Sequence, residues 1–97
     1  MFPFGNMSNP VRTTKELGDA IRSVRKALGV TQDQLALTSG TNRRFIIELE
    51  QGKPTTQTGK VLQVLRTLGI HLSLVPPPGI DAPGTLSTRE KTDGTAA

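Results

Sequence analysis

The chain has 97 residues, enough for one compact domain with a tail but too few for a multidomain enzyme. Hydrophobic residues make up 34% of the sequence and aromatic residues only 3%, so the core must be small and built mainly from aliphatic side chains. The lack of cysteine excludes disulfides, thiol nucleophiles and thiolate metal sites, and it favours a cytoplasmic location. No apolar run approaches the roughly 18 residues of a membrane span, so we expect a soluble protein.

Positive charge is concentrated in the middle of the chain. The formal net charge is +4, and residues 10–75 carry ten basic against five acidic side chains. An excess of this kind favours an anionic partner such as nucleic acid. It also serves simply to keep a small protein soluble, and the charge alone does not separate the two interpretations.

The first predicted helix follows a loose N-terminal arm. Residues 1–12 contain two prolines and no apolar period, so we expect this arm to be flexible. Thr13 or Thr14 can cap a helix that Gly29 ends. Four apolar residues recur at helical spacing along one stripe of this helix: Leu17, Ile21, Val24 and Leu28.

Two short helices come next. Thr31, with Gln34 three residues later, has the pattern of a capping box, and Gly40 ends this second helix after about two turns. A third helix is expected over residues 42–51, and Gly52 follows it directly. Two capped helices joined by a short turn with a glycine have the spacing of a helix-turn-helix motif.

The last predicted elements are a helix, a strand and a tail. Residues 57–68 have apolar side chains at helical spacing, whereas residues 70–75 alternate with period two, as a β-strand does. Residues 76–97 are rich in Pro, Gly, Thr and Ser, and we expect them to be disordered. The sequence therefore predicts an all-α domain of four to five helices over residues 13–69, followed by one β-strand.

A single strand requires a partner for its backbone hydrogen bonds. The simplest partner is the same strand of a second copy, which would give a homodimer with an apolar face formed by Ile70, Leu72 and Leu74. The alternative is that the segment folds back on its own helices as an irregular extension.

Three stretches carry a resemblance to a known family. They are residues 24–36, residues 40–46 and residues 48–53, which include the signatures Thr-Gln…Leu-Ala and Leu-Glu-x-Gly. Together they resemble the lambda-repressor-like helix-turn-helix family, also called the Cro or XRE family. The added strand resembles antitoxins of the HipB type, whose partner is a HipA-like serine/threonine kinase toxin. The resemblance implies an autoregulating repressor that binds its own operator DNA as a homodimer and restrains a toxin.

The third helix carries side chains that suit a DNA major groove. Arg43 and Arg44 can donate paired hydrogen bonds to guanine or bind phosphates, and an outward Ile47 can contact a thymine methyl group. Thr31 and Gln32 lie at the N-terminus of the second helix, where backbone amides favour a phosphate. The alternatives are an ordinary solvated face for the arginines and a first-turn polar residue for Gln32.

The resemblance assigns further roles within the same surface. It implies that Gln32 contacts a phosphate and braces the third helix, and that Arg25 and Glu50 form a structural pair between the first and third helices. The expected DNA-binding residues are Thr31, Gln32, Asn42, Arg43, Arg44, Ile47, Glu48 and Lys53.

Other functions have less support in the sequence. His71 is the only histidine, and no phosphate-binding glycine loop or metal-ligand spacing is present, so we expect no enzyme, cofactor or metal site. Two alternatives to an antitoxin remain. One is a stand-alone phage-type or housekeeping repressor without a toxin, and the other is a protein-binding module without DNA contacts.

Overall fold

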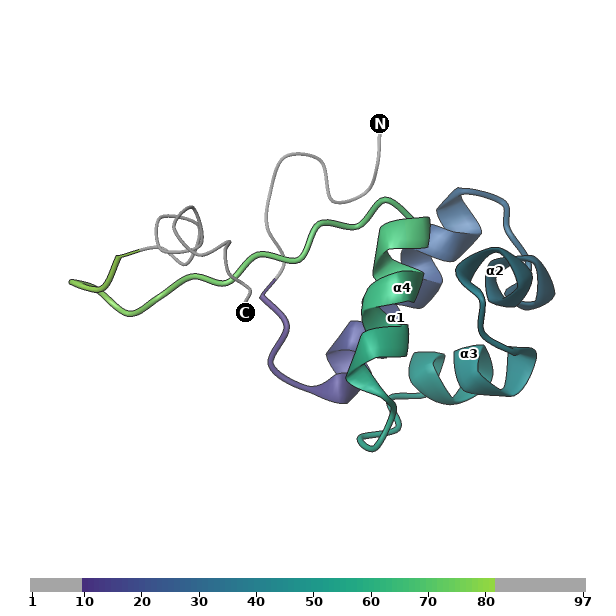
Figure 1. Cartoon of the computed structure of the whole chain (residues 1–97), viewed down its shortest axis with the longest axis horizontal. Coiled ribbons are helices and arrows are strands. Elements are labelled where there is room, and N and C mark those ends of the chain that lie inside the picture. The colour runs from purple at the N-terminus through teal and green to yellow at the C-terminus, as the bar shows by residue number, and fades with distance from the viewer. Residues whose placement is uncertain (1–9, 82–97) are drawn as a thin grey trace, which may run out of the picture.

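The computed structural model of the chain describes residues 10–81, which contain four helices (Figure 1). Their bounds are α1 Thr14–Ala27, α2 Gln32–Ser39, α3 Arg43–Glu50 and α4 Thr58–Thr67. No strand occurs among these described residues. The predicted all-α class and the helix order are confirmed.

Local sequence signals account for where three of the helices begin. Thr13 caps α1 by accepting a hydrogen bond from the Glu16 amide at 3.0 Å. Thr31 and Gln34 form the predicted capping box of α2, with reciprocal side-chain to backbone bonds of 3.0 and 2.9 Å. The Asn42 side chain caps α3 in the same way by accepting from a backbone amide at 2.8 Å. The caps at Thr31 and Asn42 fix where the two helices of the predicted motif begin.

The core is aliphatic, as the composition predicts. Its buried members come from all four helices and the C-cap of α4, and α2 packs against both α3 and α4 while α1 packs against α3. They are Ile21, Leu35, Ala36, Ile46, Leu49, Val61, Val64, Leu65 and Leu68. Leu28 continues the apolar stripe of α1 in the sequence, but it is 44% exposed. It lies at the C-cap of α1, beyond the last turn that the other helices cover.

Gly18 allows α1 to cross very close to the end of α3. A Cβ atom at this position would lie 2.7 Å from the Glu50 carbonyl oxygen and even closer to that of Leu49. Both obstacles are backbone atoms, so no side-chain rotation relieves the overlap. We therefore expect Gly18→Ala to destabilise the fold by about 1 to 3 kcal/mol, despite the better helix propensity of alanine.

Thermal or urea unfolding checks this expectation, with Gly59→Ala in α4 as the matched control. A Cβ atom at Gly59 meets nothing within 4 Å, so that variant should be as stable as the parent or up to about 1 kcal/mol more stable. Equal stability of the Gly18→Ala variant and the parent would contradict the close crossing.

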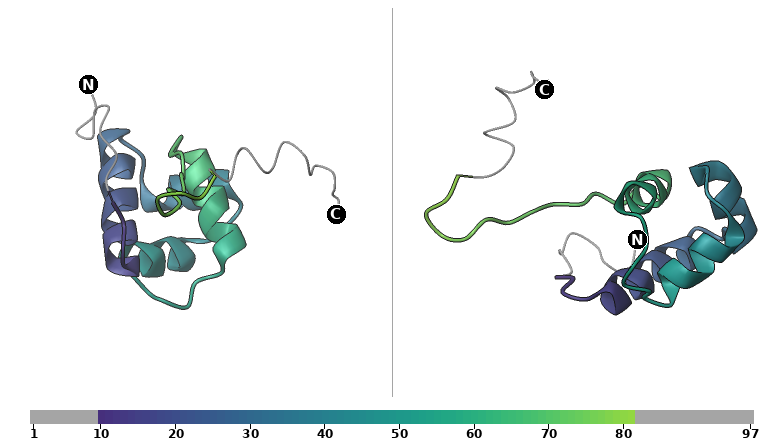
Figure 2. Two further views of the ribbon diagram at one scale, coloured as in Figure 1. Left: turned by 90° about the vertical axis from the view of Figure 1, so that its left-hand side faces the viewer. Right: turned by 60° about the horizontal axis from the view of Figure 1, so that its bottom comes forward.

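The segment after α4 leaves the helical bundle. Ile70 still packs against the core, but Leu72 and Leu74 are 62% and 72% exposed, and the chain runs away from the helices (Figures 1 and 2). Residues 70–75 form no strand in this single chain, since a strand is defined by hydrogen bonds to a partner. Pairing across a dimer remains a prediction. Residues 1–9 of the predicted flexible arm and residues 82–97 of the predicted disordered tail lie outside the described residues.

Candidate nucleic-acid interface

The candidate interface is built on α2, the turn after it, and α3. Gly40 has a left-handed conformation with φ of 74°, which lets the chain turn directly from α2 to Asn42 and α3. Ile46 and Leu49 are buried on one side of α3. The opposite side of α3 therefore faces away from the core.

Arg43 and Arg44 lie on this outer side, where the sequence predicts them, and both are exposed. The Arg43 Nε atom is 3.7 Å from Asp33 Oδ1 in α2, and the two side chains are 63% and 74% exposed. An ion pair as exposed as this one contributes little stability and is screened by salt. Arg43 is thus free to change partners.

Ile47, which the sequence predicts to point outward, is partly exposed. Its side chain is half-buried and lines a hollow of about 250 Å³ together with residues of α1 and α2. Arg22 and Gln32 are among the other lining residues of this hollow. Part of the Ile47 side chain therefore stays accessible, and its contact with a thymine methyl group remains a prediction.

Glu48 holds two of the expected DNA-binding cations. Its carboxylate oxygens lie 3.3 Å from Arg44 Nε and 3.2 Å from Lys53 Nζ. The hydrogen bond from Lys53, followed by the charges of Lys53 and Arg44, holds the pKa of the Glu48 carboxyl below its usual value. Glu48 is therefore ionised at neutral pH and offsets part of the positive charge on this side of α3.

A buried ion pair fixes α3 relative to α1. Arg25 donates to Glu50 through Nε at 2.6 Å and Nη2 at 3.0 Å, and through Nη1 to the Val30 carbonyl at 2.9 Å. The structure thus brings together the pair that the resemblance implies. Gln32 joins it, because its Nε2 atom donates to Glu50 Oε1 at 3.1 Å. Three helices meet in this network, so the orientation of α3 is rigidly set.

Several of the expected site residues use their side chains within the fold. The Thr31 hydroxyl and the Asn42 amide oxygen accept the capping hydrogen bonds of α2 and α3. Lys53 lies in the loop after α3 and reaches back to Glu48. The expected dimer residues form a separate group: Ile70, Leu72 and Leu74 lie in the segment that leaves the bundle.

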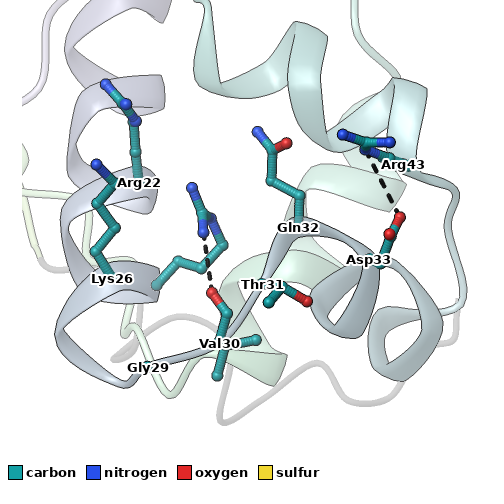
Figure 3. A pocket seen from close by; sticks show the side chains of 9 residues that line it. Arg22, Lys26, Gly29, Val30, Thr31, Gln32, Asp33 and Arg43 are labelled. Carbon is teal, nitrogen blue, oxygen red and sulfur yellow. Dashed lines mark hydrogen bonds and ion pairs between the residues drawn. The ribbon is translucent and has the colours of Figure 1, made fainter.

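Sequence reasoning missed a second group of cations beside this surface. A hollow of about 490 Å³ lies between α1, the N-terminus of α2 and the start of α3 (Figure 3). Arg22 and Lys26 of α1 stand on one side of it, Arg43 stands on the other, and Gln32 lies between them. The spacing of Arg22 and Lys26, four residues apart on one helix face, is the signal that could have found them.

The described part of the chain has neither a cluster of metal ligands nor a membrane-spanning helix. Residues 10–81 contain no group of three or more potential metal ligands. None of the four helices is both long and apolar enough to cross a membrane.

Comparison with known sequences identifies the family. A model described as a helix-turn-helix domain matches residues 18–74. An uncharacterized HTH-type transcriptional regulator from Sinorhizobium fredii, y4mF, is 46% identical over 71 residues, which cover 73% of this chain and 93% of that protein. Another such regulator, from Haemophilus influenzae, is 38% identical over 52 residues, which cover 54% of this chain and 53% of that protein.

Solved structures share the same fold. The HipA-HipB-O2-O3 complex contains a chain that matches with a TM-score of 0.67 at 23% identity, over 71% of this chain and 97% of that one. The restriction-modification controller protein C.AhdI from Aeromonas hydrophila matches with a TM-score of 0.55 at 28% identity, over 60% and 84% of the two chains. The XRE-like resemblance seen in the sequence is thereby confirmed. The chain belongs to the helix-turn-helix domain family and is homologous to HTH-type transcriptional regulators.

Proposed function

We propose that the protein is a sequence-specific transcriptional repressor that binds operator DNA as a homodimer in the cytoplasm and catalyses no reaction. The observation that carries this proposal is the outer side of α3. It presents exposed Arg43 and Arg44, while the buried Arg25–Glu50 pair holds the helix in place. A rigid helix with exposed arginines suits the DNA major groove.

In this proposal α3 enters the major groove with Arg43 and Arg44 facing guanine bases or flanking phosphates. The exposed edge of Ile47 lies against a thymine methyl group, and Thr31 and Gln32 approach a phosphate at the N-terminus of α2. The Glu48 carboxylate lies beside Arg44 and Lys53, so it competes with the DNA phosphates for these two cations. This competition weakens nonspecific binding, in which the protein contacts only the phosphates of the DNA.

Hydroxyl-radical footprinting on the DNA upstream of the protein's own gene tests the proposal. A dimer with two copies of α3 should protect two half-sites whose centres are about one DNA turn, or a multiple of it, apart. A uniform loss of cleavage along the duplex, without defined half-sites, would contradict sequence-specific binding. No protection at any concentration would favour a protein-binding module instead.

The dimer is proposed to form through residues 70–75. Beyond Ile70, which packs against the core, this segment extends away from its own helices, which supports pairing with a second copy over the fold-back alternative. Deleting residues 70–97 should therefore give monomers in light scattering and weak DNA binding. Deleting only residues 79–97 should leave the dimer and its affinity intact. A dimer that survives the longer deletion would exclude this arrangement.

We further propose that the repressor is the antitoxin of a type II toxin–antitoxin pair whose toxin is a HipA-like kinase. The similarity in fold to HipB, which has been solved together with HipA, supports this assignment. Co-expression with the product of a neighbouring reading frame that carries kinase motifs tests it. Co-purification of the two proteins and relief of growth inhibition are the expected results. A gene neighbourhood without such a reading frame would favour the stand-alone repressor.

A further inference from the structure

We propose that the hollow between α1 and the N-terminus of α2 binds one phosphate of the DNA backbone, with Arg22 and Lys26 supplying the positive charge. This inference rests on the proposed DNA binding and extends it to α1, to which the sequence assigned no contact with DNA. It is carried by the charge of the hollow, by its free hydrogen-bond donors and by its position beside α3.

The hollow has an excess of positive charge. Arg22, Lys26 and Arg43 line it with exposed side chains, and the opposing carboxylate is that of Asp33. Arg25 also borders the hollow, but its guanidinium is already bound within the buried network. In the part of the chain that the structure describes, no carboxylate lies within 4 Å of Arg22 or Lys26. Both cations are thus available to an incoming anion.

Hydrogen-bond donors point to the same ligand. Gln32 Nε2 uses one of its two hydrogens for Glu50 and keeps the other. The capping box of α2 uses the amides of Thr31 and Gln34, which leaves the backbone amides of Gln32 and Asp33 without an acceptor in the helix. The helix dipole makes that end positive. The cations of α1 and the N–H donors at the N-terminus of α2 together match a phosphate, which carries negative charge and several acceptor oxygens.

The position of the hollow favours the DNA backbone over a free phosphate ion as the ligand. Arg22 and Gln32 also line the smaller hollow, together with Ile47 of α3 and Gln51, the C-cap of α3. The two hollows therefore adjoin, and a phosphate bound in the larger one lies beside the outer side of α3. In the proposed complex, a duplex with its major groove on α3 passes its backbone over this point.

Fluorescence anisotropy with the full chain tests the assignment over a series of salt concentrations. The probes are a labelled duplex from upstream of the gene and a duplex of the same composition in shuffled order. Arg22→Gln and Lys26→Gln should each weaken binding to both duplexes by the same factor, about three- to tenfold, because phosphates carry no sequence information. Each should also reduce the slope of log affinity against log salt by about 0.9 per protomer.

Arg66→Gln is the matched control, because Arg66 is an exposed cation of α4 that lines neither hollow. It should leave the slope unchanged, and all three variants should melt like the parent. Parent-like slopes for both α1 variants, or a loss confined to one duplex, would overturn the phosphate assignment. Inorganic phosphate that binds to the parent but not to the two α1 variants, while those variants keep the parent's affinity for both duplexes, would identify a free ion as the ligand and also overturn it.

These outcomes are distinct from failure of the proposed function. A parent protein that binds neither duplex would overturn both the repressor proposal and this inference. A parent protein that binds the upstream duplex, with α1 variants that behave like Arg66→Gln, would overturn this inference alone.

Discussion

Replacing Arg25 with alanine is expected to lower the free energy of unfolding by about 3 to 5 kcal/mol. The side chains of Arg25 and Glu50 are 9% and 3% exposed, so the truncation leaves a buried carboxylate with only the Gln32 amide as a partner. The Val30 carbonyl loses its donor as well. Urea unfolding followed by circular dichroism measures the loss.

Arg22→Ala is the matched control for this prediction. Arg22 lies on the same helix, is exposed and has no ion pair within residues 10–81, so its removal should change stability by no more than about 0.5 kcal/mol. The double variant Arg25→Met, Glu50→Leu should recover part of the loss, because it removes both charges together. Equal unfolding midpoints for the parent and Arg25→Ala would exclude a stabilising role for the pair.

The second large effect concerns DNA affinity. Arg43→Ala or Arg44→Ala should weaken operator binding by about 1 to 3 kcal/mol if the side chain reads a guanine, and sequence preference should relax at that base pair. The fold should be unaffected, since both side chains are exposed and their ion pairs are weak. Anisotropy titrations with single-base variants of the operator locate the base that each arginine contacts.

The same experiment separates base contacts from phosphate contacts. An arginine on a phosphate would give equal losses on every duplex and a shallower dependence on salt. Operator binding by the double Arg43→Ala, Arg44→Ala variant at the parent's affinity would show that α3 is not the recognition helix.

Local signals in the sequence were enough to predict the helices. The capping box of Thr31 and Gln34 and the left-handed Gly40 act within a few residues, so they can be recognised without the rest of the fold. The apolar period of α4 likewise predicted its buried side. The exposure of Arg43 and Arg44 could also be predicted, because it follows from the burial of the opposite side of α3.

Features that depend on contacts between helices were not predicted. Periodicity alone does not show that Leu28, which continues the apolar stripe of α1, is exposed at the C-cap. Nothing in the sequence showed that Gly18 lies against the backbone of α3. The cations Arg22 and Lys26 lie off the apolar stripe like any solvated charge, and only the packing of α1 beside α2 places them on a shared hollow.

The ratio of two dissociation constants tests the central claim most directly. One is for the duplex from upstream of the gene, and the other is for the shuffled duplex of the same composition, both measured with the full chain at physiological salt. The proposed function predicts that the upstream duplex binds at least about a thousandfold more tightly. Equal dissociation constants for the two duplexes would contradict the claim that this protein reads a DNA sequence.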